Sequence, residues 1–154
     1  MALEIERKFL IRKELFPAET DGLLIRQGYL LSSPEKSIRV RLHGDQGFLT
    51  IKGPDIQGVR AEFEYVIPLD DAVSLFDDFC VEGKIIKIRR TIMIGYHLWE
   101  IDEFLGDNAG LWLAEVELVS RDEHVDLPPW IDTEVTGDVR YFNTYLAQHP
   151  FNSW

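Results

Sequence analysis

The sequence predicts an α+β fold that is mainly β, with eight antiparallel strands and two helices. Three observations support this. Apolar residues recur at every second position in eight short runs, only two stretches have helical spacing, and glycine-containing turns separate several of the runs. The 154 residues, 45% of them hydrophobic, suffice for the core of one compact domain. Because no repeat or linker interrupts the chain, we expect residues 1–154 to form a single domain.

The expected strands follow one another closely along the chain. Gly44, Asp45, Gln46 and Gly47 supply hairpin turn chemistry between the third and fourth strands, and glycines separate the last three. The eight strands are expected at residues 3–11, 24–32, 38–42, 48–52, 59–67, 85–94, 96–104 and 112–119.

Two stretches have helical spacing instead. In residues 70–81, apolar side chains at 72, 73, 75, 76 and 79 follow a helical repeat, and Asp70 or Asp71 is a suitable N-cap. A second helix is expected over about 137–148, starting near Thr136 or Asp138 and ending before Pro150. Pro128 and Pro129 predict an irregular connection from the last strand to this helix.

Composition excludes several classes of function. With 27 acidic and 16 basic residues, the chain has a net charge of −11, which disfavours nonspecific binding to nucleic acid or to anionic membranes. A single cysteine, Cys80, can form neither an internal disulfide nor a thiolate zinc cluster. No run reaches the roughly 18 apolar residues of a membrane span, and the N-terminus is charged where a signal peptide is apolar. We therefore expect a cytoplasmic protein.

The polar face of the expected strands carries charged residues in pairs spaced two apart. Such pairs project from one face of a strand, about 7 Å from each other. One interpretation places them on the solvated outer face of a sandwich, as ordinary cross-strand ion pairs. The other closes the eight strands into a barrel with this face inward, which leaves room for one small ligand. Repulsion within each pair favours the barrel, where an opposite charge, a metal or a ligand lies between like charges.

The side chains themselves indicate the ligand. Carboxylate pairs without cysteine or suitably spaced histidine suit hard divalent cations, Mg²⁺ or Mn²⁺ above zinc. Arginine and lysine together suit an extended polyphosphate. A metal beside a phosphate clamp predicts phosphoryl transfer or hydrolysis. The carboxylates are Glu4, Glu6, Glu62, Glu64, Asp102, Glu115 and Glu117, and the cations are Lys8, Arg39, Arg41, Lys52, Lys87 and Arg89.

In this order along the chain, the charged set resembles the CYTH, or triphosphate tunnel metalloenzyme, superfamily. The Arg26–Leu30 segment and the Glu134–Thr136 and Arg140–Asn143 segments are similar to its small bacterial members. The resemblance implies a closed eight-stranded antiparallel barrel, over about residues 2–119, that forms a tunnel flanked by helices. It also implies metal-dependent hydrolysis or cyclisation of triphosphates, and inorganic tripolyphosphate is the substrate that this branch suggests.

We expect the seven carboxylates to bind metal directly or to orient its waters, and the six cations to bind phosphates. Lys87 is also a candidate for proton transfer, since a lysine among other cations can have a lowered pKa. Tyr29 is a candidate acid/base or substrate contact, with a core aromatic as the alternative. Arg140, Tyr141 and Asn143 either close one end of the tunnel or belong to a helix docked on the barrel.

Two other functions are compatible with the sequence. The same tunnel could hydrolyse a nucleoside or thiamine triphosphate, or cyclise ATP as class IV-type adenylate cyclases do. Alternatively, the chain could be a noncatalytic module that binds polyphosphate or a nucleotide. The expected partner is in each case a small-molecule triphosphate, not nucleic acid or membrane, and a homodimer is compatible with the sequence.

Overall fold

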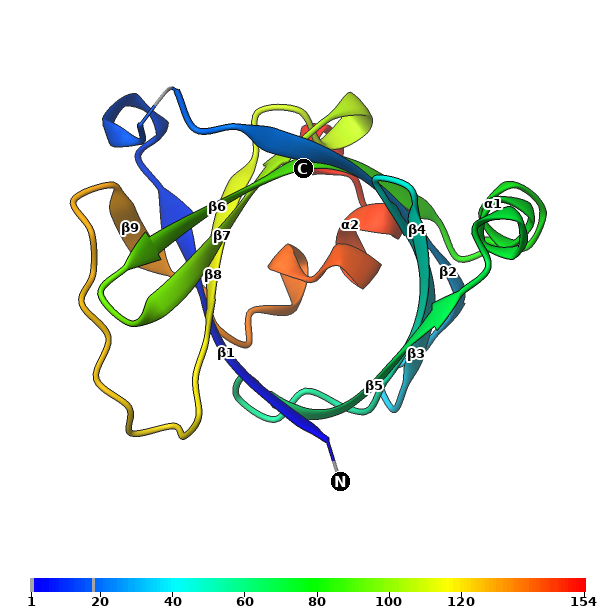
Figure 1. The fold of residues 1–154 in the computed structure, drawn as a ribbon, viewed down its shortest axis with the longest axis horizontal. Helices are drawn as coiled ribbons and strands as arrows, with labels where there is room; N and C mark the ends of the chain where they lie inside the picture. Colours follow the sequence, from blue (N-terminus) through cyan, green and yellow to red (C-terminus); the bar gives the residue numbers. More distant parts are fainter. Residues whose placement is uncertain (1, 18) are drawn as a thin grey trace.

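The computed structural model, which describes residues 2–17 and 19–154, contains a closed barrel of eight antiparallel strands (Figure 1). Neighbouring strands follow the order β5-β4-β3-β2-β6-β7-β8-β1, and pairing of β1 with β5 closes the ring. This confirms the predicted fold class. The strands are β1 (Leu3–Ile11), β2 (Gly22–Ser32), β3 (Ser37–His43), β4 (Gln46–Lys52), β5 (Val59–Ile67), β6 (Lys84–Ile94), β7 (His97–Phe104) and β8 (Trp112–Glu117).

A short strand, β9 (Ile131–Glu134), extends the sheet at β1 and was not predicted. It follows the Pro128-Pro129 pair and has only four residues, so it is too short for an alternating pattern to stand out. β1 therefore pairs with three strands, with β5 through its first residues and with β8 and β9 through the rest.

The two helical stretches differ from prediction in length. α1 (Leu69–Asp78) ends three residues before the predicted boundary. The C-terminal stretch is divided into a 3₁₀ turn, η3 (Val139–Tyr141), and a short helix, α2 (Asn143–Gln148), because Phe142 has an extended backbone conformation between them. Asp138 caps η3 by accepting a hydrogen bond from the Arg140 amide. Of the helices in the described residues, none has the length and apolar character needed to cross a membrane.

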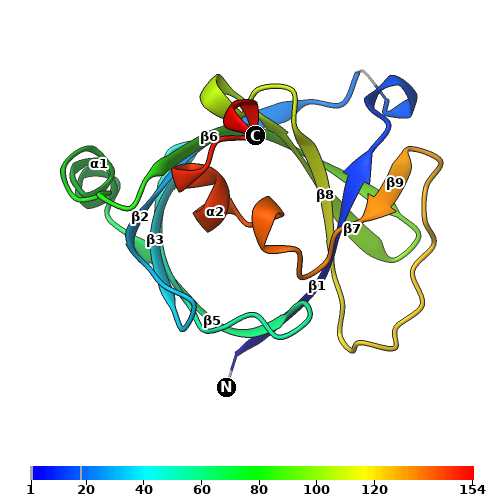
Figure 2. The same cartoon turned by 180° about the vertical axis from the view of Figure 1, so that it is seen from behind.

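The alternating pattern puts charged side chains inside the barrel and apolar side chains outside. On the outer face of β3, Val40 and Leu42 are buried against Ala72 and Phe76 of α1. In Figures 1 and 2, α1 lies outside the ring beside β2, β3 and β4, whereas α2 lies within the outline of the ring in both views. The amphipathic strand pattern is thus satisfied by a charged lumen and a covered outer wall.

The largest apolar cluster lies outside the barrel wall near β1, β7 and β8. Phe9 and Trp99 of the wall pack with Phe16 and Trp130, and the Trp99 and Trp130 rings meet edge to face at 5.7 Å. Neither helix contributes a residue to this cluster. Its cover is the irregular chain around Phe16 and the segment from Leu118 to Ile131.

Candidate active site

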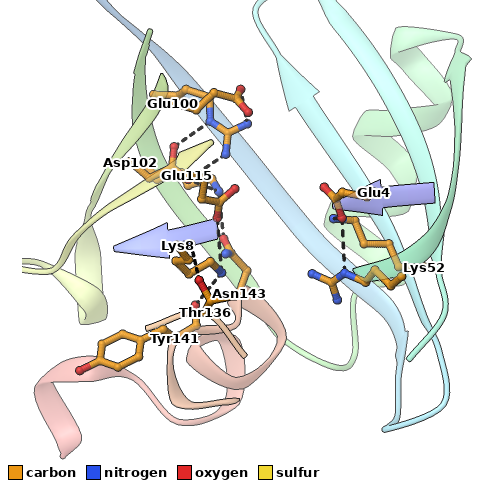
Figure 3. A network of polar contacts seen from close by, with 12 residues as sticks. Glu4, Lys8, Lys52, Glu100, Asp102, Glu115, Thr136, Tyr141 and Asn143 are labelled. Carbon is orange, nitrogen blue, oxygen red and sulfur yellow. Dashed lines mark hydrogen bonds and ion pairs between the residues drawn. The ribbon is translucent and has the colours of Figure 1, made fainter. Parts of the chain in front are cut away.

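A cavity of about 230 Å³ lies inside the barrel and is lined almost entirely by polar and charged side chains. Figure 3 shows these side chains on two sides of the lumen, with Glu4 and Lys52 facing the group formed by Lys8, Glu100, Asp102 and Glu115. Every barrel strand except β7 contributes an expected site residue to the lining. The expected residues on the wall are Glu4, Glu6, Lys8, Tyr29, Arg39, Arg41, Lys52, Glu62, Glu64, Lys87, Arg89, Glu115 and Glu117.

Asp102 is the one expected site residue that does not line the cavity. It is buried behind the wall, where Oδ2 accepts from Lys87 Nζ at 2.7 Å and both oxygens accept from the Arg89 guanidinium at 2.7 and 2.8 Å. Burial alone would raise the Asp102 pKa, but these two cations lower it well below its usual range. Asp102 therefore holds Lys87 and Arg89 in place from behind.

On one side of the lumen, Lys8 joins β1 to β8 and to the C-terminal segment. Its ammonium lies 3.3 Å from Glu115 Oε1 and donates to the Tyr141 carbonyl at 3.2 Å. Lys8 and Glu115 are direct partners in the β1–β8 register. Burial opposes ionisation of Glu115, yet Lys8 and Arg89 lower its pKa to about 2. Both members of this ion pair are therefore charged, and both side chains are largely buried.

On the opposite side, Glu4 accepts from Lys52 Nζ at 2.8 Å and from Arg60 Nε at 3.4 Å. Burial would raise the Glu4 pKa, but Lys52, with smaller contributions from Glu62 and then Arg60, lowers it to about 2. Lys52 Nζ also lies 3.3 Å from Glu62 Oε2, although not in hydrogen-bond geometry, so this buried oxygen has no hydrogen-bond partner. The Glu62 pKa is raised, first by burial.

Like charges face one another where β1, β8 and β7 meet. Glu6 is the direct partner of Glu117, and Glu115 is the direct partner of Glu100. Neither Glu6 nor Glu117 belongs to an ion pair among the described residues. Burial, reinforced by Glu115 and Glu4, raises the pKa of Glu6 to about 8. An opposing pair of carboxylates is destabilising unless a cation lies between them.

Two lumen arginines, Arg41 and Arg39, are incompletely paired. Arg41 donates to the Gln27 amide oxygen at 3.0 Å and takes part in no ion pair among the described residues. Burial, followed by Arg39 and Arg89, lowers the Arg41 pKa to about 9. Arg39 bonds Thr50 and Glu64 through Nη2, but its buried Nε has no partner. Buried polar groups without partners are rare, and these face a cavity suited to an anion.

Lys87 and Tyr29 both lie at the cavity wall. Lys87 is 1% exposed, and its ammonium donates to Asp102 and to Asn143 Oδ1 at 3.0 Å. Burial lowers the Lys87 pKa to about 7 against the opposing effect of Asp102, and Arg89 and Arg41 lower it further. The Tyr29 hydroxyl accepts from Gln27 Nε2 at 3.1 Å. Both candidates for proton transfer are therefore held by side-chain amides.

The structure adds residues that the sequence prediction missed. Arg60 lines the cavity, and its spacing with Glu62 and Glu64 on β5 could have revealed it. Phe142, Asn143 and Thr144 of the C-terminal segment also line it, and no local pattern could have placed them there. Of the three tail residues considered, Asn143 reaches the lumen and Tyr141 contributes its carbonyl, whereas Arg140 pairs with Asp138 outside the lumen.

The carboxylates fit a hard divalent cation by their chemistry. Across residues 2–17 and 19–154, no three Asp, Glu, His or Cys side chains are already gathered closely enough to hold an ion. Lys8 and Lys52 instead neutralise part of the set. Glu6 and Glu117, which form no ion pair among the described residues, and the Glu62 oxygen, which accepts no hydrogen bond, supply oxygen ligands for such an ion.

A family model for the CYTH domain matches residues 2–144. The chain belongs to the CYTH family. A protein of Acetivibrio thermocellus named inorganic triphosphatase is 40% identical over 154 residues, which cover 100% of this chain and 99% of that protein. A Nitrosomonas europaea protein of the same name is 38% identical and covers 94% of this chain and 96% of its own length.

Solved structures also match this CYTH domain. A crystal structure described as an inorganic triphosphatase has a TM-score of 0.66 and 34% identity, and the match covers 96% of this chain and 95% of the other. A Pyrococcus horikoshii protein has a TM-score of 0.57 at 22% identity, covering 77% and 80% of the two chains, which supports the fold alone.

Proposed function

We propose that this CYTH domain hydrolyses inorganic tripolyphosphate to diphosphate and phosphate inside its barrel, with Mg²⁺ or Mn²⁺. One observation carries the proposal. The same lumen contains Arg41, which has no carboxylate partner, and Glu6 and Glu117, which have no cationic partner among the described residues. A polyphosphate alone would satisfy only the arginines, and a metal alone only the carboxylates. The two inorganic triphosphatases that are about 40% identical over nearly their whole length support the same substrate.

We assign the cations to the phosphates. Arg39 and Arg41 offer N–H groups for phosphoryl oxygens, and Lys8, Lys52, Arg89 and Arg60 add positive charge around the chain. Lys87 is assigned to a phosphate contact with a second role in holding or releasing a proton at Nζ, since its pKa lies near 7. Asp102 is assigned to holding Lys87 and Arg89.

Glu4, Glu6, Glu62, Glu64, Glu115 and Glu117 are the residues that would hold the divalent ion. When bound, such an ion neutralises phosphate charge and lowers the pKa of a coordinated water. The chain's own contribution is a rigid wall that fixes these oxygens beside the phosphate-binding cations. The same proposal places the enzyme in the cytoplasm, which cell fractionation tests.

The direct test measures phosphate release from tripolyphosphate, ATP and thiamine triphosphate, with Mg²⁺, Mn²⁺ or EDTA, together with a check for cyclic AMP. We expect metal-dependent turnover of tripolyphosphate with the highest kcat/KM of the three. Preferential turnover of ATP or thiamine triphosphate, or formation of cyclic AMP, would overturn the substrate assignment. Tight tripolyphosphate binding without turnover at any metal concentration would instead establish a binding module.

The metal assignment is tested separately with a Glu115→Ala, Glu117→Ala double variant. We expect the Mg²⁺ or Mn²⁺ dependence of the remaining activity to change. If the metal dependence of this variant equals that of the unmodified protein, these two carboxylates do not hold the ion.

A further inference from the structure

A pair of buried side-chain amides, Gln27 and Asn143, joins the two candidates for proton transfer. Gln27 Nε2 donates to Tyr29 Oη at 3.1 Å and to Asn143 Oδ1 at 3.2 Å. Asn143 Oδ1 also accepts from Lys87 Nζ at 3.0 Å. Gln27 is 0% exposed, so each of its polar atoms needs a partner from the protein.

Two fixed donors determine which way both amides face. Arg41 Nε lies 3.0 Å from one end of the Gln27 amide, and a guanidinium can only donate. That end of Gln27 is therefore its oxygen, and its NH₂ group faces Tyr29 and Asn143. The Lys87 ammonium likewise only donates, so the Asn143 atom that it contacts is the oxygen. The amide orientations follow from chemistry at both ends.

This polarity has a consequence for Tyr29. The two N–H groups of Gln27 are both used, one by Tyr29 Oη and one by Asn143 Oδ1. Because Tyr29 Oη accepts from Gln27, the Tyr29 O–H proton points elsewhere, and Tyr29 lines the lumen. The Lys87 ammonium donates two of its N–H groups to Asp102 and Asn143, which leaves the third available for a ligand in the lumen.

We propose that Gln27 is a positioning residue for the triphosphatase reaction, which fixes the Tyr29 hydroxyl as a hydrogen-bond donor to a phosphoryl oxygen. This inference rests on the proposed function and adds to it a residue outside the cavity wall. Gln27 does not touch the substrate. It acts through Tyr29, and its hydrogen bond with Arg41 fixes the orientation of its side-chain amide. Asn143 completes the arrangement and ties the start of α2 to it.

Gln27→Glu tests the proposal with almost no change in shape. A carboxylate still accepts from Arg41, but it cannot donate to Tyr29, so the phenol proton turns back toward residue 27. We expect kcat for tripolyphosphate to fall by about 10²-fold, as for loss of one preorganised donor, and KM to change by less than about threefold. Tyr29→Phe is expected to lower kcat to the same extent.

The decisive measurement is the double variant Gln27→Glu with Tyr29→Phe. If Gln27 acts through the phenol, the double variant is no slower than Tyr29→Phe alone. Losses that multiply in the double variant would overturn the proposal, because Gln27 would then act independently of Tyr29. Unchanged kcat in Gln27→Glu would overturn it as well.

Two further variants complete the design. Gln46→Glu makes the same chemical change at the exposed first residue of β4, and we expect its kcat to equal that of the unmodified protein. Gln27→Met, which is neutral and of similar size, replaces Gln27→Glu in the cycle if the buried carboxylate prevents folding. Absence of tripolyphosphate turnover in the unmodified protein refutes the proposed function. If the unmodified protein hydrolyses tripolyphosphate and Gln27→Glu has the same kcat, only this inference is refuted.

Discussion

Glu6 on β1 and Glu117 on β8 are direct cross-strand partners, and both carboxylates face the lumen without a cation of their own. Like charges directly opposite in a sheet are destabilising by up to about 1 kcal/mol. The barrel thus retains a local instability that a bound cation would remove.

At about pH 9, above the Glu6 pKa of about 8, Glu117→Gln is expected to raise the free energy of unfolding of the metal-free protein by about 1 kcal/mol, because the repulsion with ionised Glu6 is relieved. The same change should lower triphosphatase activity at least about 10-fold through weaker metal binding. Urea unfolding in EDTA and phosphate release measure the two effects. Glu35→Gln, an exposed control, should change neither. A loss of both stability and activity in Glu117→Gln would contradict this explanation.

Glu6 gives the metal-free protein a distinct dependence of stability on pH. Its pKa is about 8 when folded, against a usual value of 4.5, so the folded state binds the proton more tightly. The stabilisation is complete below pH 4.5 and is lost as the pH rises through about 8. The free energy of unfolding, measured with urea in EDTA, should therefore fall over this range by on the order of a few kcal/mol at most. Glu6→Gln should remove this slope, and an unchanged slope would contradict the shift.

Arg60 is expected to contribute to substrate binding although it lies outside the predicted cation set. Arg60→Gln should raise KM for tripolyphosphate about 10-fold through loss of a charged contact. Arg90→Gln is the matched control, since Arg90 pairs with Glu103 and bonds Thr20 away from the cavity lining. Equal KM values for the two variants would remove Arg60 from the phosphate site.

Gly28 lies between Gln27 and Tyr29 and next to Cys80, which is the second residue after the end of α1. A Cβ added at Gly28 would overlap Sγ and Cβ of Cys80. Gly28→Ala should therefore destabilise the protein by about 1–3 kcal/mol and disturb the neighbouring amide. Adding Cys80→Gly removes both overlapping atoms and should restore most of the lost thermal stability. Failure of this rescue would show that backbone conformation, not crowding, requires the glycine.

The strands and most of the lumen residues could be predicted because both depend on an alternation that is local in sequence. Arg60 follows the same alternation and was within reach of the same reasoning. Phe142 and Asn143 were not, since their place at the lumen depends on the extended backbone at Phe142 and on α2 docking through Leu146 against Ile85 and Phe104. Asp102 was predicted at the site, but only packing determines whether a buried carboxylate faces the cavity or supports its wall.

β1 pairs with strands that lie far from it in the sequence, and this affects how the enzyme folds. Leu3–Ile11 must wait for residues 59–61, then 112–117 and finally 131–134 before its pairings are complete. Contacts so distant in sequence carry a large loop-closure cost and make folding slow. During synthesis, Glu4 can meet Lys52 and Arg60 early, whereas Lys8 remains without Glu115 until most of the chain has emerged from the ribosome. The closed tunnel is therefore among the last features to form.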